Sequence, residues 1–143
     1  MKTLGRHVLT EFYGCKHKIL DNIEEIKSLM EQAALFSGAT IIDSRFHRFN
    51  PHGVSGVVII AESHLAIHTW PEFDYASIDI YTCGTSVDPW KAYQYLKDHL
   101  NPRTDTKMEL MRGSIEESDT TQCHRDAEAI APRLIPITES SQA

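Results

Sequence analysis

The sequence predicts an α+β fold: a two-layer α/β sandwich in which two helices cover one face of a mainly antiparallel sheet. Short runs rich in β-branched and aromatic residues follow one another between turn signals, and several alternate apolar with polar side chains. Two longer segments repeat apolar residues at three- and four-residue steps, as amphipathic helices do. Runs of strands between two such helices favour helices packed on one face of the sheet.

The first strand is predicted over residues 6–13, where apolar side chains precede a glycine. The first helix is predicted over residues 21–37. Asp21 or Asn22 can cap its start, because short polar side chains accept hydrogen bonds from the first free N–H groups. Gly38 can end it in a left-handed conformation.

Four strand-like runs follow, each bounded by proline, glycine or polar turn residues. They cover residues 40–49, 55–61, 65–70 and 76–83. The second helix is predicted to begin at Asp88-Pro89, a cap followed by proline at the first helical position, and to reach about Leu100. A final short strand over residues 107–111 closes the domain, and we write the order as β-α-β-β-β-α-β.

Composition excludes several classes of protein. The 143 residues are 41% hydrophobic and 24% charged, which is typical of a soluble globular domain with one core. The net charge of −6 argues against nucleic-acid binding. The longest apolar run is too short to span a bilayer, and residues 1–7 lack the apolar stretch that is typical of a secretory signal. Three cysteines without CxxC spacing argue against a disulfide framework and a zinc ribbon. We expect a cytoplasmic protein that binds neither metal, nucleic acid nor membrane.

The composition changes from residue 113 onward. Residues 114–122 are polar and typical of a solvated, weakly structured tail, whereas residues 127–137 could form a short docked segment. We therefore expect a domain over residues 1–112 and a polar tail, partly docked or disordered, over residues 113–143.

The most informative stretch is residues 61–72, Ala-Glu-Ser-His-Leu-Ala-Ile-His-Thr-Trp-Pro-Glu. Its hydrophobic pattern is that of two strands joined by a tight turn at Glu62-Ser63-His64. A Ser-His pair at a turn is common and needs no catalysis. The pattern alone therefore predicts an ordinary hairpin.

The longer sequence around this stretch closely resembles the prokaryotic S-adenosylmethionine decarboxylases, the short-chain, pyruvoyl-dependent class. The resemblance covers roughly residues 4–112 in order and without detectable gaps, which is unlikely to arise by chance. Ala66 departs from it, because a small hydroxyl residue is expected there, and the tail after Gly113 matches nothing in the family. The segments that carry the resemblance are residues 4–7, 11–13, 37–40, 46–49, 53–57, 62–72, 75–84 and 87–92.

The resemblance implies a precursor that cuts itself between Glu62 and Ser63 into chains 1–62 and 63–143. In such enzymes the serine oxygen attacks the preceding carbonyl to give an ester, and β-elimination then leaves a covalently bound pyruvoyl group. This cofactor replaces pyridoxal phosphate: it forms a Schiff base with the substrate amine and accepts electrons as carbon dioxide leaves. The substrate would be S-adenosylmethionine, and the product its decarboxylated form, the aminopropyl donor for spermidine biosynthesis.

Catalytic roles follow from the resemblance by position. Ser63 is the pyruvoyl precursor, and Glu62 is left at the new C-terminus. His68 corresponds to the base for β-elimination during processing, and Ser55 to a second processing residue. Cys83 corresponds to the general acid that returns a proton after decarboxylation.

Substrate-binding roles are carried over in the same way. Glu72 resembles the carboxylate that binds the ribose hydroxyls. Phe49 and Phe12 are candidates to sandwich the adenine ring or contact the sulfonium, and Trp70 to line the same pocket. Six other histidines are expected to be structural or solvated, namely His7, His47, His52, His64, His99 and His124.

Two alternatives stay open. Pyruvoyl-dependent arginine or ornithine decarboxylases share the fold, and Glu72 with the two phenylalanines favours a nucleoside substrate over theirs. A non-catalytic regulator would be expected to have lost Ser63, His68 or Cys83, and all three are present.

Two predicted helices cover only one face of the sheet. Aromatic and polar residues on the other face suggest that two copies pair sheet to sheet. The resemblance implies such dimers, with each active site at or near the interface. We expect a homodimer of processed protomers.

Overall fold

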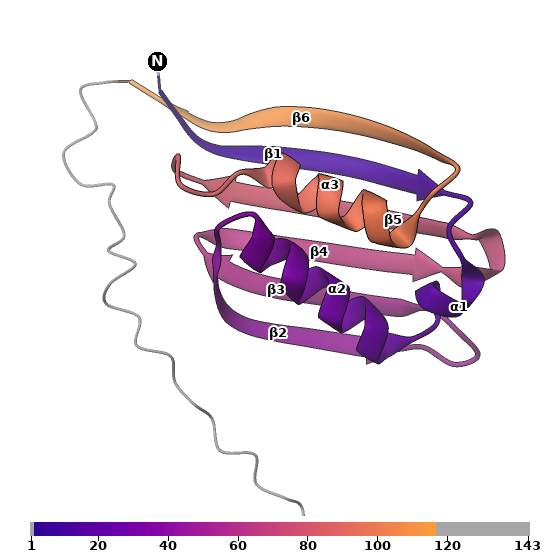
Figure 1. The fold of residues 1–143 in the computed structure, drawn as a ribbon. Helices are drawn as coiled ribbons and strands as arrows, with labels where there is room; N and C mark the ends of the chain where they lie inside the picture. Colours follow the sequence, from indigo (N-terminus) through magenta and orange to yellow (C-terminus); the bar gives the residue numbers. More distant parts are fainter. Residues whose placement is uncertain (1, 117–143) are drawn as a thin grey trace, which may run out of the picture.

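The computed structural model describes residues 2–116, which form one antiparallel six-stranded sheet with its two longer helices on one face (Figure 1). The strand order is β2-β3-β4-β5-β1-β6. The elements in chain order are β1 (Lys2–Tyr13), α1 (His17–Leu20), α2 (Ile23–Phe36), β2 (Thr40–Arg48), β3 (Val54–Ala61), β4 (Ser63–Trp70), the 3-10 helix η1 (Pro71–Phe73), β5 (Tyr75–Cys83), α3 (Pro89–Leu100) and β6 (Thr104–Ile115).

The predicted fold class is confirmed, but the predicted order is one strand short. Four strands, β2 to β5, lie between α2 and α3, in agreement with the four strand-like runs and not with the order β-α-β-β-β-α-β. The start of the first predicted helix is also corrected: a separate four-residue helix, α1, precedes it. Asn22 then caps α2 by accepting a hydrogen bond from the Glu25 N–H at 3.2 Å.

The last strand is longer than predicted. β6 pairs with β1 along its whole length, from Lys2 opposite Ile115 to Tyr13 opposite Thr104. Residues 113–115, which the composition assigned to the tail, therefore belong to the sheet. The docked segment expected over residues 127–137 lies outside the described residues.

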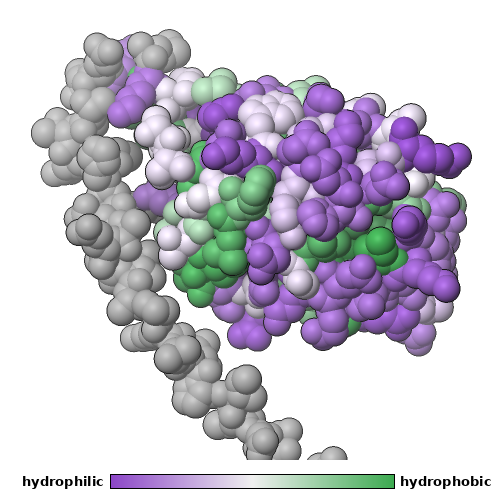
Figure 2. All heavy atoms as spheres, in the orientation of Figure 1, coloured by the Kyte–Doolittle hydropathy of each residue, from purple (hydrophilic) through white to green (hydrophobic). Residues whose placement is uncertain are grey.

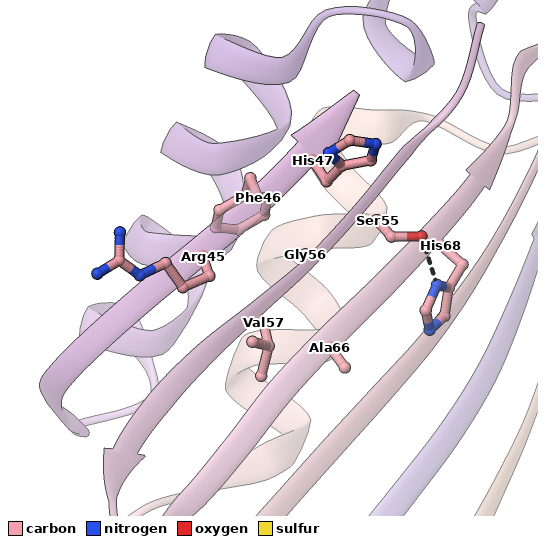
Figure 3. A pocket seen from close by; sticks show the side chains of 8 residues that line it. All are labelled: Arg45, Phe46, His47, Ser55, Gly56, Val57, Ala66 and His68. Atoms are coloured by element: carbon pink, nitrogen blue, oxygen red, sulfur yellow. Dashed lines mark hydrogen bonds between the residues drawn. The ribbon is translucent and has the colours of Figure 1, made fainter. Parts of the chain in front are cut away.

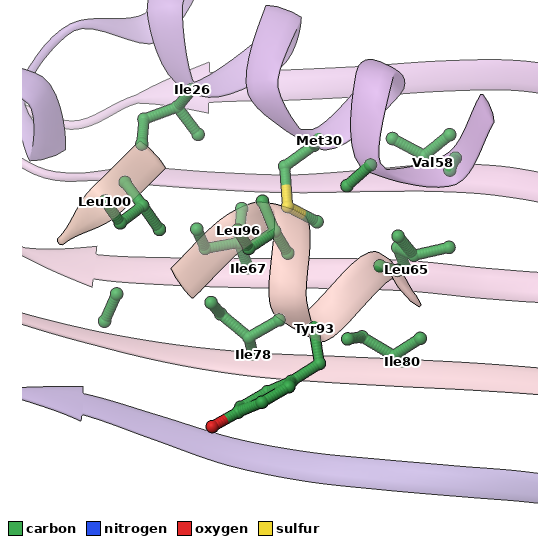
Figure 4. Close-up of a cluster of buried hydrophobic side chains, with 14 of the residues drawn as sticks. Ile26, Met30, Val58, Leu65, Ile67, Ile78, Ile80, Tyr93, Leu96 and Leu100 are labelled. Carbon is green, nitrogen blue, oxygen red and sulfur yellow. The ribbon is translucent and has the colours of Figure 1, made fainter. Parts of the chain in front are cut away.

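The core lies between the sheet and the two longer helices. Figure 4 shows side chains of α2 and α3 meeting those of β3, β4 and β5 in one layer. Along β4 the buried residues Leu65, Ile67 and Thr69 alternate with His68 and Trp70, which remain exposed. Burying each large apolar side chain contributes roughly 1.5–3 kcal/mol, so this alternation fixes which face of the strand meets the helices.

The other face of the sheet is not covered by any helix of residues 2–116 (Figure 1). The helix-covered side is mostly hydrophilic in Figure 2, with small hydrophobic areas. On the uncovered face, Ile59, Met108 and Leu110 are each more than 40% exposed. Within the described part of the chain, no helix has the length and apolar character needed to cross a bilayer.

A polar cluster attaches α3 to the edge strand β6. The Asp105 carboxylate accepts hydrogen bonds from the Tyr93 hydroxyl at 2.5 Å, from Lys97 Nζ at 2.8 Å and from Lys107 Nζ at 3.2 Å. The hydrogen bond from Lys97 is the main cause that holds the pKa of Asp105 well below its usual range. The ionised carboxylate therefore stabilises the fold above the pKa of an unfolded aspartate, and this stabilisation is lost as the pH falls through the folded pKa.

Asp105→Asn is expected to lower the free energy of unfolding at pH 7 by about 1–3 kcal/mol, because it weakens three hydrogen bonds to a charged acceptor. The difference from the parent protein should shrink below about pH 4, where the unfolded aspartate is protonated. Urea unfolding at pH 7 and at lower pH measures both the loss of stability and its decrease with pH. It is carried out at one protein concentration in a Ser63→Ala background, which is expected not to cleave itself. Asp98→Asn on the exposed side of α3 is the control and should change stability by less than about 0.5 kcal/mol. Equal effects of the two variants would contradict the role of the cluster.

Candidate active site

The expected scissile bond lies in the connection between β3 and β4. Ile60 pairs with Ser63, so only Ala61 and Glu62 lie between these two paired residues. Ser63 has a φ of 110°, in a region that side-chain-bearing residues rarely adopt. Such a conformation costs roughly 1–3 kcal/mol and persists only where the surroundings enforce it. Backbone strain is therefore located at the residue that follows the bond.

Cys83, the last residue of β5, contacts both sides of this bond. Its backbone N–H donates to the carbonyl oxygen of Glu62 at 3.3 Å. Its Sγ lies 3.3 Å from the Ser63 Oγ. The register of β4 and β5 explains this placement, because Ser63 pairs with Thr82, the residue before Cys83. The structure thus brings the predicted serine, its preceding carbonyl and the predicted proton donor together.

The two cysteines of the described residues differ in their surroundings. Burial raises the pKa of Cys15 to about 11, so this thiol stays protonated at neutral pH. Cys83 is only partly buried and lies beside Ser63. Of these two cysteines, Cys83 is therefore the one placed to exchange a proton with a group at position 63.

Ser55 and His68 form a second pair. They lie opposite one another on β3 and β4, and Ser55 Oγ is 2.7 Å from His68 Nδ1. Figure 3 shows the two side chains pointing toward each other at the side of a cavity of about 420 Å³. That cavity is lined by Arg45, Phe46, His47, Ser55, Gly56, Val57, Ala66 and His68.

A second cavity, of about 290 Å³, adjoins the same pair. Three of the four predicted substrate-binding residues, Phe49, Trp70 and Glu72, line it together with Ser55 and His68. Trp70 is held in place by an aromatic stack: its ring lies 5.1 Å from that of Tyr75, which lies 5.2 Å from that of Tyr13. The carboxylate of Glu72 and the aromatic side chains of Phe49 and Trp70 therefore line the same cavity.

Phe12 does not lie with the other predicted substrate-binding residues. It is fully buried in the core under the helices, and its ring lies 6.0 Å from the ring of Tyr93 on α3. The reason is strand alternation, since Phe12 shares its side of β1 with buried Val8 and Thr10. The expectation that Phe12 contacts a ligand is corrected accordingly.

The two groups of residues lie at opposite ends of the β3–β4 hairpin. Ser63 pairs with Ile60, whereas His68 pairs with Ser55, five positions further along β4. At about 3.3 Å per residue, five positions correspond to roughly 16 Å. Within one chain His68 is therefore too far from Ser63 to take a proton from it. Sequence order alone did not reveal this separation.

Asp21 and His52 support the second cavity, and neither was predicted to do so. Asp21 accepts hydrogen bonds from the Gly53 N–H at 2.9 Å and from Arg48 at 2.7 Å, at both ends of the loop after β2. The Gly53 N–H is the main cause that lowers the pKa of Asp21. His52 Nε2 lies 3.2 Å from Glu72 Oε2. The Asn-Pro-His-Gly sequence signalled a turn, but no local pattern linked it to Asp21 or Glu72.

The family model described as S-adenosylmethionine decarboxylase matches residues 6–113 of this chain. The chain belongs to the S-adenosylmethionine decarboxylase family. Proteins of Thermosipho africanus and Thermotoga maritima, both named S-adenosylmethionine decarboxylase proenzyme, are each 56% identical over 117 residues, 82% of this chain and 90% of the relative. The crystal structure of the adenosylmethionine decarboxylase from Aquifex aeolicus superposes with a TM-score of 0.78 at 42% identity, over 82% of this chain and 97% of that one.

The family resemblance seen in the sequence is thereby confirmed. The word proenzyme in the relatives' names denotes a precursor that is processed. Among residues 2–116, no group of three or more His, Cys, Asp or Glu side chains is arranged to hold a metal ion.

Asp21→Asn is expected to loosen the loop that carries Phe49 and His52, because the neutral amide binds Arg48 and the Gly53 N–H less strongly. Amide hydrogen exchange of peptides covering residues 49–54 should accelerate roughly tenfold, while exchange in β4 stays unchanged. Mass spectrometry of deuterium uptake at pH 7 measures these exchange rates. Asp43→Asn on β2 is the control, and equal acceleration in both variants would contradict an anchoring role of Asp21.

Proposed function

We propose that this chain is a precursor that cleaves itself between Glu62 and Ser63 and then decarboxylates S-adenosylmethionine with a pyruvoyl group made from Ser63. The observation that carries the proposal is the pair of contacts from Cys83 to the Glu62 carbonyl and to the Ser63 hydroxyl. The N–H can stabilise the carbonyl oxygen during an attack by the Ser63 hydroxyl, and the thiol lies beside that hydroxyl.

Cleavage begins when Ser63 Oγ attacks the carbonyl carbon of Glu62. A C–O bond forms, the C–N bond breaks, and the serine nitrogen takes up the proton to leave an ester. Negative charge develops on the Glu62 oxygen, toward which the Cys83 N–H points at 3.3 Å. One such donor is typically worth about 10²–10³ in rate. The unfavourable φ of Ser63 raises the energy of the starting state by roughly 1–3 kcal/mol and lowers the barrier further.

The ester is then broken by β-elimination. A base removes the proton from Cα of residue 63, a Cα–Cβ double bond forms, and the Glu62 carboxylate leaves from Cβ. Water then replaces the nitrogen, which departs as ammonia, and the new chain begins with a pyruvoyl group. His68 suits the role of base: a tautomer that donates its Nδ1 proton to Ser55 leaves Nε2 free to accept one.

A second copy of the chain can supply a His68 close to Ser63, which the His68 of the same chain is too far away to reach. Two sheets stacked through their helix-free faces, and turned end for end, bring Ser55 and His68 of each copy to Ser63 and Cys83 of the other. The exposed apolar side chains on that face supply surface for such packing. We therefore place each active site between two processed protomers of a homodimer.

The second cavity is the proposed binding site for the substrate. Glu72 accepts hydrogen bonds from the ribose hydroxyls, while Phe49 and Trp70 contact the adenine ring or the sulfonium. The pyruvoyl group supplies the electron sink for loss of carbon dioxide. The Cys83 thiol then donates the proton that completes decarboxylated S-adenosylmethionine. Free arginine or ornithine has no ribose for Glu72 and no ring for the aromatic walls.

Self-cleavage is tested first by intact mass after incubation with S-adenosylmethionine and cyanoborohydride. The wild-type protein should give chains of residues 1–62 and 63–143, with a reduced adduct on the second chain. Ser63→Ala should stay a single uncut chain, because it lacks the attacking oxygen. Uncut wild-type protein after long incubation would contradict self-processing. Cleavage without an adduct would retain the pyruvoyl group and redirect the search to arginine and ornithine.

The shared active site is tested by mixing two inactive variants. Ser63→Ala and His68→Ala should each fail to mature alone. In a mixed dimer, isolated with two different tags, the His68→Ala chain should be cut, because its Ser63 meets His68 of the other copy. The Ser63→Ala chain should stay intact, which provides an internal control on the same mass spectrum. A mixed dimer that remains uncut would contradict the arrangement across two copies.

A further inference from the structure

The contact between His52 and Glu72 has no role in the chemistry above. We propose that His52 is a specificity-determining residue that orients the Glu72 carboxylate toward a ligand with two adjacent hydroxyls. This inference rests on the proposed function, because it deepens the role given to Glu72. It concerns the binding of the nucleoside and not the processing of the chain.

Glu72 stands in the middle of η1 and has no neighbour on its own helix to fix it, since η1 is only three residues long. His52 Nε2 approaches Glu72 Oε2 to 3.2 Å, and both residues line the same cavity. Their side chains are 34% and 37% exposed, so the pair lies at the mouth of the cavity. A glutamate in this position would otherwise sample several rotamers, and ordering it upon binding would weaken affinity.

The contact leaves the carboxylate able to bind a diol. An ionised carboxylate accepts about four hydrogen bonds, two on each oxygen. His52 approaches Glu72 at Oε2, so Oε1 and at least one position on Oε2 can accept hydrogen bonds from a ligand. Two vicinal hydroxyls can therefore bind without displacing the histidine. A ligand without these hydroxyls gains nothing from the orientation of Glu72.

His52 is itself held by the short loop between β2 and β3. The Phe49 N–H donates to the carbonyl of Gly53 at 2.8 Å and closes the loop. The Asp21 carboxylate then accepts from the Gly53 N–H at 2.9 Å. On the other side, His17 Nδ1 lies 2.9 Å from the Pro71 carbonyl at the start of η1. Contacts from α1 and the residue after it thus fix both the loop that carries His52 and the helix that carries Glu72.

The test compares adenosine with 2′,3′-dideoxyadenosine by calorimetric titration of the processed enzyme. His52→Ala should weaken adenosine binding by about fivefold to twentyfold, because Glu72 loses the contact with His52 that orients its carboxylate. Binding of the dideoxy ligand should change by less than about twofold, since that ligand offers Glu72 no hydroxyls. His52→Gln, whose amide nitrogen can replace Nε2, should restore adenosine binding to within about threefold.

His99→Ala is the matched control, because His99 is exposed on α3 and stacks on Tyr95 away from the cavity. Equal losses for both ligands in His52→Ala would overturn the inference and show that His52 merely shapes the pocket. Unchanged binding of both ligands would overturn it as well. If the wild-type enzyme does not discriminate between the two ligands, the proposed role of Glu72 fails and the inference falls with it. If His52→Ala still discriminates between adenosine and 2′,3′-dideoxyadenosine as strongly as the wild-type enzyme, the inference is overturned but the proposed role of Glu72 stands.

Discussion

The antiparallel register of β3, β4 and β5 is the constraint on which the rest of the molecule depends. Buried Leu65 and Ile67 on β4 lie opposite Ile80 and Ile78 on β5, and a slip by one residue would turn all of them away from the helices. The same register sets Ser63 beside the residue before Cys83 and pairs His68 with Ser55. Core packing and site geometry are thus fixed by one set of strand pairings.

Most of the fold was predictable because its strands and helices have strong hydrophobic periodicity. The two features that were missed lack such a signal. α1 spans four residues, too few for a helical repeat, and only Leu20 in it is buried. β6 is an edge strand with nearly every residue exposed, so its ends show no alternation. Its true length follows from pairing with β1, which a local pattern does not encode.

For the site, the sequence supplied residue types and order but not distances. Glu62, Ser63 and Cys83 could be named from a motif, yet their mutual contacts arise from strands that meet only in the folded sheet. Phe12 lies four residues after Val8 in the predicted strand and therefore on the same face, which the structure buries. The resemblance had instead placed Phe12 at the ligand. The link from His52 to Glu72 joins a loop to a 3-10 helix twenty residues later, a contact that no periodicity indicates.

The division of the proposed site between two copies couples maturation to assembly. An unpaired chain already holds the Glu62 carbonyl against the Cys83 N–H, with the strained Ser63 beside it. The proposed base, however, lies roughly 16 Å away on the same strand. Under the proposed arrangement, ester formation would depend on contacts within one chain, and elimination would depend on His68 of the other copy. In the proposed homodimer, the same pairing would face the Glu72 cavity of one copy toward position 63 of the other. A single interface would therefore complete both the reaction that creates the cofactor and the pocket that presents substrate to it, so weakening that interface would impair both together.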